Sequence, residues 1–228
     1  TGDLTSTSYE SPFYHLYGGL KTQYLIHADE LSEAGLLAGS INSISFEVVS
    51  VGTTYQDLTV SLGTTTNNAM TTTFESGLTP VYTTAAYTPV AGTNTIIFTT
   101  PYTWDGTSNL VVEFCWSNNN SGGPSTTVKY DNTSYVSQAY YRVDNIPAPT
   151  LCAQITATAT TSKRPKFYFD GITTCASPRV AVPVKYNVPP AVTIVASSDT
   201  ICLGQEVTLT ASSSNPNYNY LWLPDSIM

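Results

Sequence analysis

DLTVSLGTT, residues 57–65, is the stretch that decides the fold class, because its side chains alternate between apolar and polar. Leu58, Val60 and Leu62 share one face, and the hydroxyl residues between them share the other. Successive side chains of a β-strand point to opposite faces, so this pattern predicts a strand with one face in a core and one in water. Such half-buried strands are typical of antiparallel sheets.

The same alternation recurs along the first 170 residues, at 44–48, 128–131 and 166–170. Turn-forming residues separate further predicted strands at 80–84, 94–99, 109–117, 136–142 and 154–160. Helical spacing occurs at residues 29–38, which predicts one helix of two or three turns. Many short strands with a single short helix favour a two-sheet sandwich.

The composition agrees with a sheet protein. Of the 228 residues, 37 are Thr, 24 are Ser and 16 are Tyr, whereas only five are Lys and seven are Glu. Thr, Tyr and Val favour pleated sheets, so the composition excludes long helices and coiled coils. A hydrophobic content of 41% excludes a disordered Ser/Thr linker. We predict an all-β protein whose main part is an antiparallel, jelly-roll-like two-sheet sandwich.

The character of the chain changes after residue 175. Residues 1–175 are predicted to form the sandwich, and residues 176–191 hold four of the 14 prolines. Proline cannot donate to a ladder, so we expect a connector or edge strand there. Residues 192–228 contain three more short predicted strands, at 192–196, 206–211 and 217–223, and Trp222 at the spacing of an immunoglobulin-like sandwich. That fold needs about 100 residues, so we expect only its first half, truncated from a longer protein.

Charge and motifs exclude several classes of function. The net charge is −8, and nucleic acid requires a basic surface. The sequence contains no run of about 18 apolar residues, so it predicts no membrane-spanning helix. No Gly-x-Ser-x-Gly or His-Glu-x-x-His motif occurs, and both His15 and His27 are interpreted as structural or solvent-facing side chains. Glu47 and Glu113 are interpreted as strand residues rather than a glycosidase pair. We therefore expect no enzymatic activity and no cofactor.

The four cysteines lie at positions 115, 152, 175 and 202, without the spacing of a zinc site. Disulfides are the preferred interpretation and place the protein outside a reducing cytoplasm, with buried free thiols as the alternative. Cys115 with Cys152 is the preferred pair, because both lie in the first domain. Cys202 pairs either with Cys175 or with a cysteine downstream, and the sequence does not choose.

The sequence offers candidate residues for a calcium site and for a sugar-stacking platform. Asp105, Asp131 and Asp144 lie at predicted turns and are candidate calcium ligands, since Ca²⁺ prefers oxygen donors. The alternative is that these side chains only stabilise the turns. Tyrosine clusters at residues 9–17 and 135–141 form a sugar-stacking platform if they are exposed, and fill the edge of the core if they are not.

The order of motifs along the chain resembles a known family. The motifs are YLIHADELSEAGLLAG (24–39), PYTWDGTSNLVVEFCW (101–116), STTVKYDNTSYVSQAYYR (125–142), TSKRPKFYFDG (161–171) and DTICLGQEVTLTASSSNPNYNYLW (199–222). In this order they resemble the β-sandwich module of large type IX-secreted surface proteins of Bacteroidota. Immunoglobulin-like or PKD-like repeats follow the module in those proteins.

The resemblance implies export by the type IX secretion machinery and residence at the cell surface or in the medium. Members include gliding and attachment adhesins, and hydrolases that carry such modules as accessories. In these bacteria O-glycans are added at Asp-(Ser/Thr)-apolar sequences, so the resemblance implies Thr200 and Ser226 as acceptors.

We expect a non-enzymatic extracellular module of a long adhesin or fibre-forming protein, which presents or spaces binding domains. The alternative is a carbohydrate-binding accessory of a secreted hydrolase. The partners expected are a surface polysaccharide or neighbouring protein chains.

Overall fold

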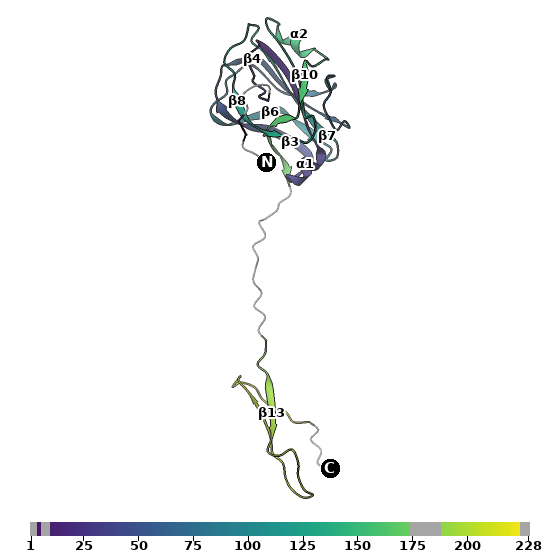
Figure 1. The fold of residues 1–228 in the computed structure, drawn as a ribbon, viewed down its shortest axis with the longest axis vertical. Helices are drawn as coiled ribbons and strands as arrows, with labels where there is room; N and C mark the ends of the chain where they lie inside the picture. The colour runs from purple at the N-terminus through teal and green to yellow at the C-terminus, as the bar shows by residue number, and fades with distance from the viewer. Residues whose placement is uncertain (1–3, 6–9, 174–187, 224–228) are drawn as a thin grey trace. The chain divides into compact units, whose positions relative to one another are not determined.

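The computed structural model describes residues 4–5, 10–173 and 188–223 (Figure 1). Contacts within the chain divide it into two compact units, Thr1–Cys175 and Ala176–Met228. Antiparallel strands make up most of the first unit, and its described part contains two short helices. The predicted all-β class is therefore confirmed.

One sheet of the first unit, which we call the β7 sheet, has the strand order β10-β9-β2-β7-β4-β5 among the described residues. Every neighbouring pair in this order is antiparallel. Its strands are β2 (Gly19–Ile26), β4 (Tyr55–Thr65), β5 (Thr79–Tyr87), β7 (Asn109–Ser117), β9 (Gln138–Val143) and β10 (Ala159–Thr161).

The other sheet, which we call the β3 sheet, is built around the long strand β3 (Leu36–Ser50). The strand β6 pairs with one edge of β3, while β12 and then β8 pair with the other edge. The strands β1 and β11 both pair with β8. The bounds are β1 (Leu4–Thr5), β6 (Gly92–Trp104), β8 (Thr127–Asn132), β11 (Lys163–Pro165) and β12 (Tyr168–Thr173).

The core lies between the inner faces of these two sheets. Leu58, Val60 and Leu62 of β4 are fully buried there, as their alternation predicts. The ring centroids of Phe46, on β3, and Phe114, on β7, lie 6.2 Å apart, so aromatic side chains of the two sheets meet in the middle. The predicted antiparallel two-sheet sandwich is confirmed.

The outer face of the β7 sheet departs from the expectation of a polar face in water. Gln23, Ser61 and Glu113 lie on this face and are nevertheless buried. The reason is that two remote segments, 66–78 and 144–158, lie over the sheet. Apolar side chains of the sheet and these segments form a second cluster made of Leu25, Met70, Phe74, Val111, Ala139 and Ala157.

The predicted helix at residues 29–38 is too long. The helix α1 spans Ala28–Glu33, and Gly35 then takes a left-handed φ of 90° that ends it. The strand β3 begins directly afterwards at Leu36. Residues 36–38, the end of the predicted helix, therefore belong to the strand β3. The reason is that pairing with β12 and packing of Leu36 in the core override local helical periodicity.

A second short helix corrects the prediction of a single one. The helix α2 spans Ala148–Cys152 and follows the extended residue Pro147. Five residues are too few for a periodic signal, which explains why the sequence does not predict it. Just beyond α2, the strand predicted at 154–160 is confined to β10, at Ala159–Thr161.

In the second unit, β13 (Val192–Ala196) pairs antiparallel with β14 (Leu209–Ser213). The third strand predicted for this unit, at 217–223, is not formed. Within residues 188–223 every side chain is exposed or half-buried, and Trp222 is 46% exposed. The immunoglobulin-like assignment of this unit, and the connector at 176–191, most of which lies outside the described residues, remain predictions.

Candidate functional site: a groove beside a disulfide

The predicted disulfide between Cys115 and Cys152 is confirmed. Cys115 lies on the outer face of β7 and is fully buried, whereas Cys152 is the last residue of α2. Their Cα atoms are 5.9 Å apart, and 37 positions separate them in the sequence. The bond therefore fixes α2 on the outer face of the β7 sheet.

The segment around α2 is also seated by packing. Leu151 is fully buried, and a Cβ atom added to Gly19 of β2 would lie only 2.9 Å from its Cδ1 atom. Just before the helix, the Ser117 hydroxyl donates a hydrogen bond to the carbonyl of Ile146 at 2.5 Å. The wall that α2 makes beside the sheet thus rests on a covalent bond, a hydrogen bond and apolar contact.

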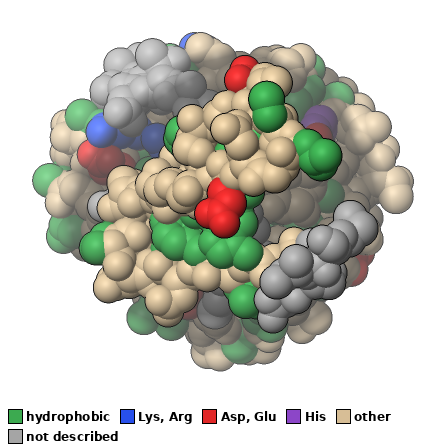
Figure 2. Space-filling model, turned by 90° about the horizontal axis from the view of Figure 1, so that it is seen from below, with side chains coloured by type: hydrophobic (Ala, Val, Ile, Leu, Met, Phe, Trp, Pro, Cys, Tyr) green, Lys and Arg blue, Asp and Glu red, His purple; other side chains and the backbone are tan. Residues whose placement is uncertain are grey.

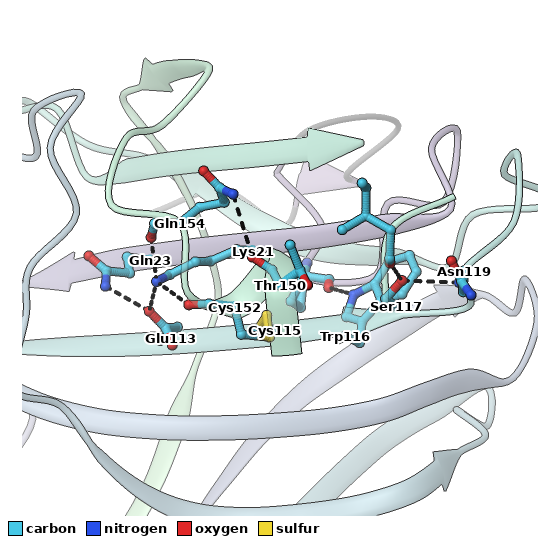
Figure 3. The surroundings of a disulfide bond; sticks show 12 residues. Lys21, Gln23, Glu113, Cys115, Trp116, Ser117, Asn119, Thr150, Cys152 and Gln154 are labelled. Carbon is cyan, nitrogen blue, oxygen red and sulfur yellow. Dashed lines mark hydrogen bonds and ion pairs between the residues drawn. A yellow bond between two sulfur atoms is a disulfide. The ribbon is translucent and has the colours of Figure 1, made fainter. Parts of the chain in front are cut away.

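Lys21 joins this wall to the sheet (Figure 3). Its Nζ atom donates to the carbonyls of Cys152 at 2.8 Å and Gln154 at 2.9 Å. The same atom lies 3.4 Å from Glu113 Oε2. Lys21 is 7% exposed, so a nearly buried ammonium is held by three acceptors of the protein. Buried charges need such pairing because desolvation is costly.

Gln23 holds Glu113 in place from the neighbouring strand. The two residues face each other in the β2–β7 register, and Gln23 Nε2 donates to Glu113 Oε2 at 2.8 Å. Gln23 also binds the backbone of Glu75 at both its carbonyl and its N–H, at 2.9 and 2.8 Å. One amide side chain therefore positions both a carboxylate of the sheet and the segment that covers it.

Two adjoining hollows lie on the outer face of the β7 sheet beside α2. One has a volume of about 550 Å³ and is lined by β4, β5 and α2, and the other, of about 300 Å³, reaches Lys21 and Glu113. Thr59 and Cys152 line both hollows. We call this surface the α2 groove and define it by Thr59, Ser61, Thr83, Glu113 and Cys152.

The lining of the α2 groove is suited to hydrogen bonding. Thr59 faces Thr83 on one side and Cys115 on the other, and Ser61 faces Glu113. Hydroxyl groups both donate and accept, while carboxylates accept. The arrangement is a row of hydroxyls that runs into a positioned carboxylate, which is chemistry for binding polar groups.

Glu47 and Glu113 do not form a glycosidase pair. Glu47 alternates with the core residues of β3 and pairs at 3.0 Å with Lys129, so it lies on the outer face of the β3 sheet. Glu113 alternates with the core residues of β7. The two carboxylates therefore lie on opposite outer faces of the sandwich, with the core between them.

Two of the three calcium candidates, Asp105 and Asp144, accept hydrogen bonds from backbone N–H groups nearby. The Ser108 hydroxyl donates to Asp105 Oδ2 at 2.6 Å, and the N–H groups of Ser108 and Thr107 donate to Oδ1 at 2.7 and 2.8 Å. The hydroxyl bond first, and then the two N–H bonds, lower the pKa of Asp105 to about 2. Asp144 Oδ1 accepts the N–H of Gly18 at 2.8 Å. Asp131 lies on β8, opposite β11, and its Oδ1 atom is buried without a hydrogen-bond partner in the described residues. In the described residues no three acidic, His or Cys side chains are grouped as metal ligands, so a calcium site stays a prediction.

The tyrosine clusters do not form an open platform in the described residues. Phe13, Tyr14 and Tyr140 are buried in the core, which favours the alternative stated for them. Tyr135 stacks on His27 with ring centroids 3.7 Å apart, so this pair is a packed structural contact.

The remaining predicted sites fall in or near the second unit. Thr200 is exposed, as an O-glycan acceptor must be, while Ser226 lies outside the described residues. Cys202 is an exposed free cysteine, and Cys175 lies outside the described residues. The glycan acceptors and the pairing of Cys202 therefore remain predictions.

Sequence reasoning did not identify Lys21, Gln23 or Glu75. The alternation of LKTQYLI in residues 20–26 was a usable signal, because it places Lys21 and Gln23 on the same face of a strand. No local signal identifies Glu75, since its role depends on contact with a strand about 50 positions earlier.

Comparison of the chain with protein-family models, curated proteins and solved structures finds no match. In the described part of the chain, no helix has the length and apolar character needed to cross a membrane. Uncharged polar side chains and backbone cover most of the face shown in Figure 2, where basic side chains are sparse.

Proposed function

We propose that this chain is a non-enzymatic extracellular module that presents or spaces binding domains in a long surface protein. Type IX secretion, an adhesin context and gliding or attachment belong to this proposal through the family resemblance alone. The structural support for the proposal is the covalent link in the first unit.

The observation that carries the proposal is the disulfide between Cys115 and Cys152. Both cysteines belong to one well-packed unit, and Cys115 is fully buried. Disulfides persist in oxidising environments and are rare where thiols are kept reduced. A disulfide in a sandwich that already has a large core supports a protein exposed to harsh conditions outside the cell.

The non-enzymatic part rests on the arrangement of the reactive side chains. His15 is enclosed by Tyr55 and Trp116, and His27 is stacked on Tyr135. General acid–base and nucleophilic catalysis need such groups within reach of a substrate and of each other. The described residues offer no such constellation, which favours a structural or binding role.

Surface labelling tests this proposal. Intact cells that make the protein are treated with an antibody against residues 1–175, with a cytoplasmic protein of the same cells as the unlabelled control. We expect labelling of intact cells. Signal only after lysis would contradict the extracellular assignment.

A second assay tests the absence of catalysis. The purified chain is incubated with polysaccharide and peptide substrates, beside a Glu113→Gln variant. We expect no turnover by either protein. Turnover by the wild-type chain that is lost in the variant would overturn the non-enzymatic proposal.

A further inference from the structure

We propose that the α2 groove binds a neutral saccharide through hydrogen bonds to Glu113 and the hydroxyls of β4 and β5. A module that only presents or spaces other domains needs no ligand, so this inference goes beyond the proposed function. It also gives the carbohydrate-binding alternative a specific location that the tyrosine clusters do not provide.

The size of the groove fits a ligand. Its two hollows have volumes of about 550 and 300 Å³. Ligand sites in proteins are typically clefts of about 300–1,000 Å³. The hollows share Thr59 and Cys152, so a chain of sugar units can run along the sheet from one hollow into the other.

Glu113 is the anchor of the site. It is 9% exposed and lines the smaller hollow. Gln23 and Lys21 both contact its Oε2 atom, at 2.8 and 3.4 Å, and within the described residues no hydrogen bond reaches its Oε1 atom. Oε1 is not one of the buried atoms without a partner, so it keeps accessible surface and is open to a ligand. A ligand hydroxyl that donates to Oε1 forms a strong, charge-assisted hydrogen bond.

The hydroxyls beside Glu113 are available in the same way. Ser61 is its cross-strand neighbour, and Thr59 and Thr83 form the next row on the same face. In residues 10–173 the hydroxyls of Thr59, Ser61 and Thr83 make no hydrogen bonds to protein atoms. Side chains that face each other on adjacent strands lie about 4.8 Å apart, which is the distance between the strands. A ligand with several hydroxyls along its length matches this spacing.

The charge of the groove selects a neutral ligand. Carboxylates of Asp57, Glu75 and Glu113 line the hollows. The one ammonium in the lining, that of Lys21, is already held by two carbonyls and Glu113. Like charges repel across such a site, so anionic polysaccharides are disfavoured.

The disulfide keeps the groove in shape. Ala148, Pro149 and Cys152 of α2 line the larger hollow, and the bond to Cys115 fixes them beside the sheet. A preformed wall lowers the cost of ordering the site when a ligand binds.

The test uses the full 228-residue chain with isotope labelling. The probes are cellohexaose, mannohexaose and galactan hexaose as neutral sugars, and hexaguluronate as the anionic one. We expect at least one neutral probe to shift the backbone amide signals of Thr59, Ser61 and Glu113. Hexaguluronate should leave them unchanged.

Variants locate the binding. Glu113→Gln should weaken the binding of that probe by about tenfold or more, since a charge-assisted hydrogen bond is lost. Thr59→Val, which replaces a hydroxyl with a methyl of similar size, should weaken it as well and serves if Glu113→Gln unfolds. Glu47→Gln and Tyr168→Ala, on the outer face of the β3 sheet, are the matched controls and should leave binding unchanged.

Three results would overturn the proposal. The first is that no neutral probe shifts the amide signals of the groove. The second is that binding depends on Tyr168 or Glu47 rather than on Glu113 and Thr59. The third is that hexaguluronate binds more tightly than the neutral probes. Each of them leaves the presenting role intact, because that role is tested by surface labelling and turnover.

Discussion

His15 is a histidine enclosed by aromatic rings. Its ring lies 5.8 Å from that of Tyr55 and 5.3 Å from that of Trp116, and it is 2% exposed. Nε2 lies 3.3 Å from Asn120 Oδ1. Burial lowers the pKa of His15 below its ordinary 6.5, although the hydrogen bonds to Asn120 and to the backbone of Pro124 and the charge of Asp144 act in the opposite direction.

This predicts a pH dependence of stability. The unfolded chain binds a proton at His15 near pH 6.5, before the folded chain does. The free energy of unfolding should therefore fall as pH decreases below about 6.5, by at most about 1.4 kcal/mol per pH unit. Urea unfolding of the wild type and His15→Phe at pH 7.5, 6.5 and 5.5 measures it. We expect a shallower decline in the variant, and equal declines would contradict the prediction.

Lys21 and Lys129 both form ion pairs, but their surroundings differ. The side chains of Lys21 and Glu113 are 9% and 12% exposed, whereas those of Lys129 and Glu47 are 26% and 40% exposed. Removing one member of a buried pair leaves a charge without compensation, which costs about 3–5 kcal/mol. Exposed pairs contribute roughly 0–1 kcal/mol.

The matched test replaces each lysine with methionine. Lys21→Met should lower the free energy of unfolding by about 3 kcal/mol, because Glu113 and two carbonyls lose their donor. Lys129→Met should lower it by less than about 1 kcal/mol. Urea unfolding at pH 7 compares the two variants. Equal losses in the free energy of unfolding would contradict the prediction, because burial would then add nothing to the contribution of the Lys21 ion pair.

At the scale of elements, α2 shows how a five-residue helix is stabilised. Its sequence, Ala-Pro-Thr-Leu-Cys, is too short to be helical in isolation. Leu151 is buried against β2 and Cys152 is bonded to β7, so tertiary contacts supply the stability. The helix α2 therefore forms only because it packs on the β7 sheet and is bonded to it.

Removing the disulfide tests this account of α2. Closing a loop of 37 residues contributes about 4 kcal/mol in the chain-entropy model. Cys115→Ala with Cys152→Ala should lower the free energy of unfolding by about that amount. It should also weaken saccharide binding, because the wall of the groove is released. The control is Cys202→Ala, at an exposed free cysteine, which should change neither quantity.

The elements differ in how far sequence alone predicts them. The pattern at 109–117 predicts β7 with its observed bounds, and alternation places Leu58 and Val60 in the core, because strand periodicity is a local property. The predicted end of the helix, at residue 38, was wrong because Leu36 pairs with β12 and so belongs to a strand. The α2 groove could not be predicted, since its walls come from segments far apart in the sequence.

At the scale of the whole chain, the two units differ in what holds them together. The first unit has an extensive core between two sheets and a second apolar cluster on the outer face of the β7 sheet. The described residues of the second unit, 188–223, bury no side chain. A lone two-stranded hairpin is marginally stable at best. The stabilising contacts and the groove therefore belong to the first unit.

The disulfide affects a single residue, an element and the whole chain. It fixes one residue of β7, seats α2, shapes the groove and supports an extracellular location for the whole chain. The groove, the position of α2 and the extracellular location all require this bond to be present in the protein as cells make it.

Disulfide mapping of the protein taken from the cells that make it, alkylated at once and without reductant, is the most direct test. Trypsin cuts after Lys129 and Arg142 and so places Cys115 and Cys152 on different peptides. We predict that mass spectrometry finds these two peptides joined through Cys115 and Cys152. Recovery of both peptides separately, each with an alkylated thiol, would contradict the account.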